Sequence, residues 1–205
     1  MILHSHHDTL TALSPVEAVY NTERPTKQKA TMTTITHESL SESIKSLARQ
    51  RPRFCSEVDF QFTLAFKIRE KFPDVEIRCG CSASHGDKST EIDIIVNSEG
   101  EIFPIALRYM LKDQKHDTEY NRDMQRDIDR VELLRFENFD FEGMNFKEPP
   151  RVIKGRFVIW LSDNDRFWNN NSVNSMVEHE GRTIPWEYYK DDFWFALVNV
   201  LHWNQ

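Results

Sequence analysis

Residues 91–109 read EIDIIVNSEGEIFPIALRY and predict a β-hairpin. A polar turn at residues 97–100 separates an apolar strand from a second strand over residues 102–109. Asp93 stands between two isoleucines of the first strand, where a carboxylate is costly unless it has a partner. The hairpin therefore predicts that Asp93 belongs to a functional site or to an ion pair.

The composition of the whole chain is that of a folded, acidic protein. A length of 205 residues suits one well-packed α/β domain, and the 14 Phe, 5 Trp and 5 Tyr favour a core over disorder. The net charge of −7 lacks the basic excess typical of duplex-binding proteins, so any contact with nucleic acid should be local or metal-assisted. There is no membrane-length apolar run and no signal-peptide pattern, and the cysteine count of three is odd and small. These features predict a cytoplasmic protein that does not bind a membrane.

The order of predicted elements indicates one α/β domain with helices flanking a mixed central sheet. Residues 1–35 lack periodicity and predict a disordered tail, with a single domain over 36–205, and translation could start at Met1 or at Met32. Helices are expected near 40–49, 56–72 and 119–135, and strands at 75–79, in the hairpin, at 157–161 and at 193–201. Residues 80–90 predict a loop. Ser56 should cap the second helix, whose inner face should carry Val58, Phe62, Ala65 and Phe72.

From residue 56 onward, the order of helix, three strands, helix and strand resembles the αβββαβ core of the PD-(D/E)xK, or restriction-endonuclease-like, nuclease superfamily. The chain is similar to uncharacterised archaeal and bacterial members of that superfamily. The stretches that carry the resemblance are FCSEVDFQ (54–61), IDIIV (92–96), PIALRY (104–109), DIDRVE (127–132) and LSDNDRFW (161–168).

The resemblance implies a metal site built around the hairpin. In that superfamily a helix Glu, a strand Asp and the Glu of a Glu-x-Lys motif hold Mg²⁺, and the Lys helps position the attacking water. Glu57, Asp93 and Arg108 match the helix, strand and lysine positions and are the expected catalytic residues. Ala106 replaces the motif Glu and has no ligand atom, and an arginine cannot shuttle a proton near neutral pH. Glu57 and Asp93 remain as ligands of a weak Mg²⁺ site, and Glu91, two residues before Asp93, is the candidate for a migrated carboxylate.

Other residues near these positions have two interpretations. Arg49, Arg51 and Arg53 precede the Glu57 helix and are candidates for contact with the DNA backbone, and Gln61 could line the same groove. Arg108 could instead form an ion pair with Asp93. On the third helix, arginines such as Arg130 alternate with acids such as Asp127, which favours mutual ion pairs on a solvated face.

Two functions remain open from the sequence. The first is a Mg²⁺-dependent endonuclease homologue with a decayed or rearranged active site. The second is a non-catalytic module of the same fold that binds DNA or a protein. Activity, substrate preference and oligomeric state are not determined by the sequence.

Overall fold

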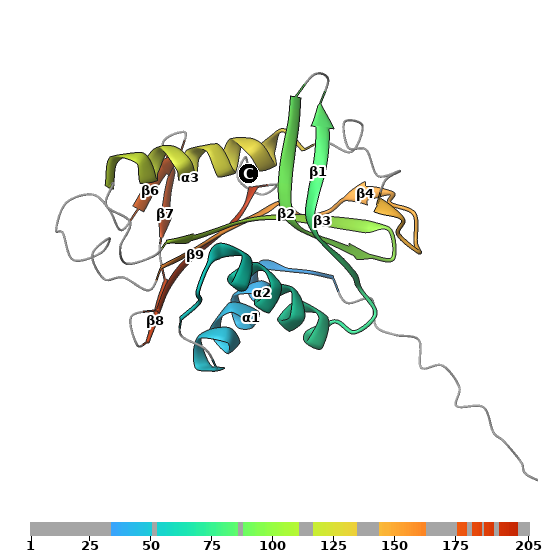
Figure 1. Cartoon of the computed structure of the whole chain (residues 1–205), viewed down its shortest axis with the longest axis horizontal. Helices are drawn as coiled ribbons and strands as arrows, with labels where there is room; N and C mark the ends of the chain where they lie inside the picture. The colour runs from blue at the N-terminus through green and yellow to red at the C-terminus, as the bar shows by residue number, and fades with distance from the viewer. Residues whose placement is uncertain are drawn as a thin grey trace, which may run out of the picture. The chain divides into compact units, whose positions relative to one another are not determined.

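A computed structural model describes residues 34–50, 53–85, 88–110, 117–134, 144–162, 176–179, 182–185, 187–190 and 193–200. This part of the chain forms a mixed sheet with helices on both faces, which confirms the predicted α/β class (Figure 1). None of the described helices is both long enough and apolar enough to cross a membrane. Ile35, assigned to the tail, is buried in the core, whereas residues 1–33 lie outside the described residues.

The predicted order of helix, three strands, helix and strand is present. The helices are α1 (His37–Gln50), α2 (Glu57–Lys71) and α3 (Asp117–Glu132). The main sheet has the order β1-β2-β3-β5-β9-β8, and β4 also pairs with β3. Its strands are β1 (Glu76–His85), β2 (Lys88–Ser98), β3 (Glu101–Met110), β4 (Val152–Ile153), β5 (Phe157–Ser162), β8 (Glu187–Lys190) and β9 (Phe193–Asn199). Strand β3 runs parallel to β4 and β5, whereas the other pairs of this sheet are antiparallel. Strands β6 (Met176–His179) and β7 (Arg182–Pro185) pair separately.

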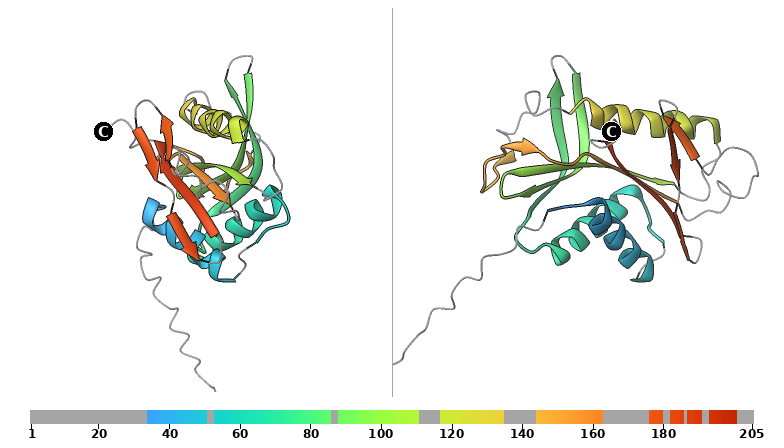
Figure 2. Two further views of the ribbon diagram at one scale, coloured as in Figure 1. Left: turned by 90° about the vertical axis from the view of Figure 1, so that its left-hand side faces the viewer. Right: turned by 180° about the vertical axis from the view of Figure 1, so that it is seen from behind.

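Two hydrophobic layers hold the helices to opposite faces of the sheet (Figures 1 and 2). Helices α1 and α2 pack on the face that carries Ile105 and Leu107 of β3. Helix α3 packs on the other face, over Ala106 of β3 and Trp160 of β5. Strand β5 lies between β3 and β9, and all six of its residues are buried, which confirms the predicted central strand.

Helix α1 begins earlier than the sequence predicts because its cap lies upstream of residue 40. Thr36 N–H donates to Ser39 Oγ (2.9 Å), and Ser39 N–H donates to Thr36 Oγ1 (3.1 Å). This reciprocal pair satisfies free backbone groups at the helix start. The helix buries one apolar stripe, Leu40, Ile44, Leu47 and Ala48.

Helix α2 has the predicted cap but only part of the predicted inner face. Ser56 Oγ accepts a hydrogen bond from Asp59 N–H (3.1 Å), as the sequence indicates. Of the residues predicted to face inward, Ala65 and Phe72 are buried, but Val58 and Phe62 are exposed. The other buried positions of the helix are Phe60, Leu64 and Ile68. The helix carries apolar residues around much of its circumference, so helical periodicity alone does not determine which stripe meets the sheet.

The hairpin forms as predicted and the strand before it is longer than predicted. Glu99 and Gly100 form the turn with positive φ angles of 52° and 86°. Asn97 Oδ1 accepts a hydrogen bond from Gly100 N–H (2.8 Å). The pairing of β1 with β2 extends from Glu76 to His85, so most of the predicted loop at residues 80–90 is strand. These residues are small and polar, and the pairing of β1 with β2 overrides their weak individual strand preference.

Candidate functional site

The candidate site lies where β2 separates from β3. The two strands pair as far as Ile94 opposite Ile105. Strand β2 then continues alongside β1, whereas the remainder of β3 pairs with β5. We call this point the strand fork and define it by Asp93 on β2 and by Leu107 and Tyr109 on β3. The departing strand leaves backbone N–H groups of β3 to be satisfied by other partners.

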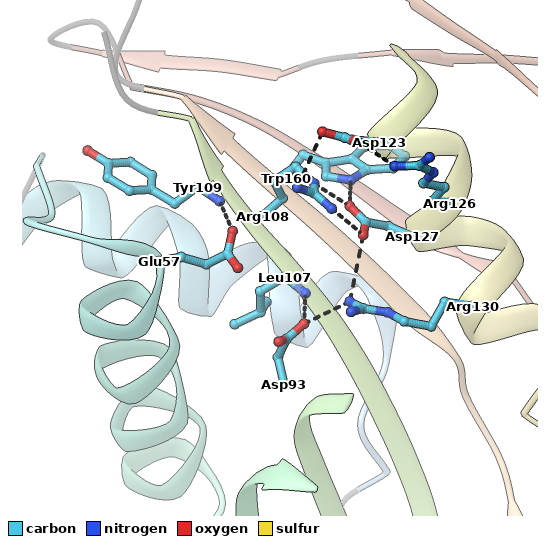
Figure 3. A network of polar contacts seen from close by, with 10 residues as sticks. All are labelled: Glu57, Asp93, Leu107, Arg108, Tyr109, Asp123, Arg126, Asp127, Arg130 and Trp160. Carbon is cyan, nitrogen blue, oxygen red and sulfur yellow. Dashed lines mark hydrogen bonds and ion pairs between the residues drawn. The ribbon is translucent and has the colours of Figure 1, made fainter. Parts of the chain in front are cut away.

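The two predicted catalytic carboxylates supply those partners (Figure 3). Asp93 Oδ2 accepts a hydrogen bond from Leu107 N–H (2.6 Å), and Glu57 Oε2 accepts one from Tyr109 N–H (3.0 Å). Gln61 Nε2 donates to the carbonyl oxygen of Asp93. A buried N–H without an acceptor costs about 1–3 kcal/mol. Side chains from α2 and β2 therefore complete the hydrogen bonding that a continuous strand pair would provide.

A local change in β1 and β2 directs Asp93 into the fork. Ile92 and Ile94 would share a face of a regular strand, but they pack in different hydrophobic clusters. On β1, Cys79 pairs with Ile94 and Cys81 pairs with Ile92, so Gly80 lies across from Asp93. Gly80 has a φ of +63°. Glycine adopts this left-handed conformation without a Cβ clash. The alternation of β2 side chains between the two faces of the sheet is thus interrupted at Asp93, and the Asp93 side chain reaches β3.

A second set of polar contacts lies on the α3 side of β3. Arg108 donates two hydrogen bonds to Asp127, from Nε to Oδ2 (2.6 Å) and from Nη2 to Oδ1 (2.7 Å). Trp160 Nε1 donates to the same carboxylate (3.1 Å), which is only 2% exposed. Arg130 Nη2 lies 3.0 Å from Asp93 Oδ2 and 3.7 Å from Asp127 Oδ1. Charges therefore alternate from Arg108 through Asp127 and Arg130 to Asp93.

Burial and these contacts shift the acid–base properties of the site. Burial raises the pKa of Asp93 above its ordinary value, and the Leu107 N–H and Arg130 partly oppose this shift. Burial also raises the pKa of Glu57, opposed by the Tyr109 N–H and by Arg108. Hydrogen bonds from Arg108 to Asp127 raise the pKa of the guanidinium further above its already high value. Arg108 therefore stays charged and is not a proton carrier.

The predicted site residues separate into two groups across β3 (Figure 3). Glu57, Asp93 and Gln61 all contact the strand fork. Arg108 points to the α3 side, so the alternative interpretation, an ion pair between Arg108 and Asp93, is wrong: Arg108 pairs with Asp127 instead. Ala106 shares the face of Arg108 and is completely buried in the apolar layer under α3.

These positions do not fit the Mg²⁺ site that the resemblance implies. Glu91 is exposed, and its Oε1 lies over Gly80 of β1. Ala106 offers no donor atom, and Asp93 Oδ2 is already occupied by the Leu107 N–H and Arg130. Within the described ranges, no three His, Cys, Asp or Glu side chains are grouped so that they could hold a metal ion.

Of the predicted DNA-contacting arginines, Arg53 lies in a segment that contacts the end of β3. Arg49 at the end of α1 and Arg53 before α2 are both exposed, and Arg51 lies outside the described residues. Phe54, the neighbour of Arg53, donates its N–H to the hydroxyl of Tyr109 (3.2 Å). The rings of Phe54 and Tyr109 pack edge to face with centroids 5.6 Å apart. The segment that carries Arg53 is therefore fixed against the end of β3.

Asp127, Arg130 and Trp160 are central to the site but were not predicted as site residues. The sequence favoured solvated ion pairs for Asp127 and Arg130, whereas both side chains face β3. A signal was available for Asp127, which lies three residues after Met124 and four before Val131. Both of these residues are buried, and helical spacing places Asp127 on their face.

Comparisons with known proteins add no relative. No protein-family model, no curated protein and no solved structure matched the chain. The α/β class therefore rests on the structure alone, and the relationship to the restriction-endonuclease-like superfamily stays a prediction.

Proposed function

We propose that the chain is a non-catalytic DNA-binding module with a restriction-endonuclease-like fold. The observation that carries this proposal is the double occupation of Asp93 Oδ2 by the Leu107 N–H (2.6 Å) and by Arg130 (3.0 Å). An oxygen with two such donors is poorly available to a metal ion. The runner-up, a Mg²⁺-dependent endonuclease with a rearranged site, requires these contacts to break.

The chemistry of phosphodiester cleavage supports the non-catalytic alternative. Metal-assisted hydrolysis needs carboxylate oxygens to hold the ion and a group that helps activate water. Ala106 supplies no oxygen, and Arg108 is held by two hydrogen bonds to Asp127. A guanidinium in this position stabilises the fold and does not exchange protons near neutral pH.

Local positive charge supports DNA as the partner. Arg49 and Arg53 are exposed, and Arg53 lies beside the fork, although the whole chain has a net charge of −7. Arginine side chains bind phosphate groups, and each neutralised phosphate releases counterions. The expected contact is therefore small and weak, and its affinity should fall with salt in proportion to the few phosphates that are neutralised.

Titration of a labelled DNA duplex at several salt concentrations, followed by fluorescence anisotropy, tests the proposal. The wild type should bind, and the double substitution Arg49→Gln and Arg53→Gln should lower the slope of log affinity against log salt by about 2. The matched control, Arg126→Gln with Lys154→Gln, removes the same charge from other exposed positions and should leave the slope nearly unchanged.

The same samples incubated with Mg²⁺ or Mn²⁺ test for cleavage on gels. Intact duplex is expected at all times. Cleavage that disappears in Asp93→Ala would establish the endonuclease alternative. Absence of binding, or an unchanged slope in the Arg49 and Arg53 variant, would remove DNA as the partner of this surface.

A further inference from the structure

Helices α1 and α2 lie side by side (Figures 1 and 2), and a polar groove of about 500 Å³ lies between them. All eight residues that line the groove are polar or charged, five of them on α1 and three on α2. Its volume is in the range of small-molecule sites, about 300–1,000 Å³, but most such sites have apolar walls. A ligand of this groove should therefore be a polar or charged group.

The α1 wall of the groove presents hydrogen-bond donors that the described part of the chain leaves unused. Ser46, Arg49 and Gln50 line the groove and share one face of the helix, because they are three and four residues apart. Within the described residues, the Ser46 hydroxyl and the Gln50 side-chain amide make no hydrogen bond. Arg49 uses only its Nε, which donates to the Lys45 carbonyl oxygen (3.4 Å). We call Ser46, Arg49 and Gln50 the α1 donors.

The α2 wall holds its cations deeper than the carboxylates that they contact. The Lys67 side chain is 15% exposed, whereas Glu70, which lies 2.5 Å from it, is 70% exposed. Lys71 and Glu42 form a second ion pair with the same asymmetry, at 33% and 72%. Ion pairs to exposed carboxylates contribute little stability, so an incoming anion can compete with either carboxylate. With Arg49, the groove has three cations and two carboxylates, in a chain of net charge −7.

We propose that this groove binds a phosphate group, held by Lys67 of α2 and by the α1 donors. Phosphate suits these walls because its oxygens accept several charge-assisted hydrogen bonds at once, and the guanidinium fork of arginine matches its geometry. Two sources supply such a group: the backbone of DNA and a free phosphorylated compound. The DNA source rests on the proposed function, because Arg49 belongs to both surfaces.

Titration with inorganic phosphate at constant ionic strength, followed by two-dimensional NMR, tests the groove. The backbone amide signals of Ser46, Arg49 and Lys67 should shift in a saturable way. Lys67→Gln should weaken phosphate binding by at least about tenfold, because it removes a charged donor. Arg49→Gln, at an exposed position where the fold does not depend on the side chain, should weaken phosphate binding likewise.

Lys154→Gln is the matched control for these variants. Lys154 also pairs with a single glutamate, Glu101 (3.5 Å), but it lies outside the groove, so this variant should bind phosphate like the wild type. A wild type without saturable shifts, or a Lys67→Gln variant that binds phosphate as tightly as Lys154→Gln does, would overturn the proposal.

Binding of a labelled DNA duplex at several salt concentrations identifies the source of the phosphate. If DNA supplies it, Lys67→Gln should lower the slope of log affinity against log salt by about 1, and Lys154→Gln should leave the slope unchanged. An unchanged slope in Lys67→Gln, together with phosphate binding by the wild type, would assign the groove to a free phosphorylated compound. Absence of any DNA binding would contradict the proposed function but not the phosphate site, because the phosphate titration measures the groove by itself.

Discussion

Replacing Arg108 with methionine should destabilise the fold by about 3–5 kcal/mol, the range for removing one partner of a buried ion pair. Arg108 donates hydrogen bonds of 2.6 and 2.7 Å to Asp127, whose carboxylate is 2% exposed. Methionine keeps the apolar stem and removes both donors. Trp160 Nε1 and Arg130 Nη2 remain 3.1 and 3.7 Å from the carboxylate oxygens of Asp127. The loss of stability is therefore expected in the lower half of that range.

Urea denaturation followed by tryptophan fluorescence measures this loss. Adding Asp127→Asn to Arg108→Met should recover part of the stability, because no buried charge is then left unpaired. Arg126→Met is the matched control: Arg126 is 63% exposed and pairs with Asp123, so its loss should cost less than about 1 kcal/mol. An Arg108→Met variant as stable as the Arg126→Met variant would refute the structural role of Arg108.

Two further predictions concern the same site. The double substitution Ala106→Glu and Arg108→Lys completes the nuclease motif, but it places a carboxylate at a completely buried position. It should therefore unfold or strongly destabilise the protein, as measured by circular dichroism. A plasmid-nicking assay should show no Mg²⁺-dependent cleavage. Burial raises the folded-state pKa of Glu57 and Asp93, so the free energy of unfolding should decrease as pH rises from about 4 through the folded-state pKa values. Urea titrations across pH should show a smaller decrease for Glu57→Gln, and an unchanged decrease would contradict the shift.

Local sequence signals predicted the elements whose stability is itself local. The turn needs residues that tolerate positive φ, and Gly100 provides one of the two. Ser56 caps α2 within its own first turn. Strand β5 is apolar at nearly every position and could be recognised as buried on both faces.

The features that the sequence did not predict depend on contacts between distant segments. The rotation of α2 is set by the sheet, which receives Phe60 and leaves Phe62 exposed. The roles of Glu57 and Asp93 follow from the separation of β2 from β3, and no residue pattern within either strand indicates where that separation occurs. A carboxylate inside an apolar strand signals that it has a partner, but whether that partner is a metal ion or a backbone N–H depends on the tertiary structure.

Amide hydrogen exchange at Leu107 and Tyr109, measured by NMR, tests most directly whether the fork carboxylates act as backbone acceptors. Asp93→Ala should lower the protection of the Leu107 amide by at least about tenfold, and Glu57→Ala should do the same for Tyr109, because each loses its acceptor. Glu91→Ala removes a neighbouring exposed carboxylate and should change neither amide. Wild-type protection of both amides in all three variants would contradict the account.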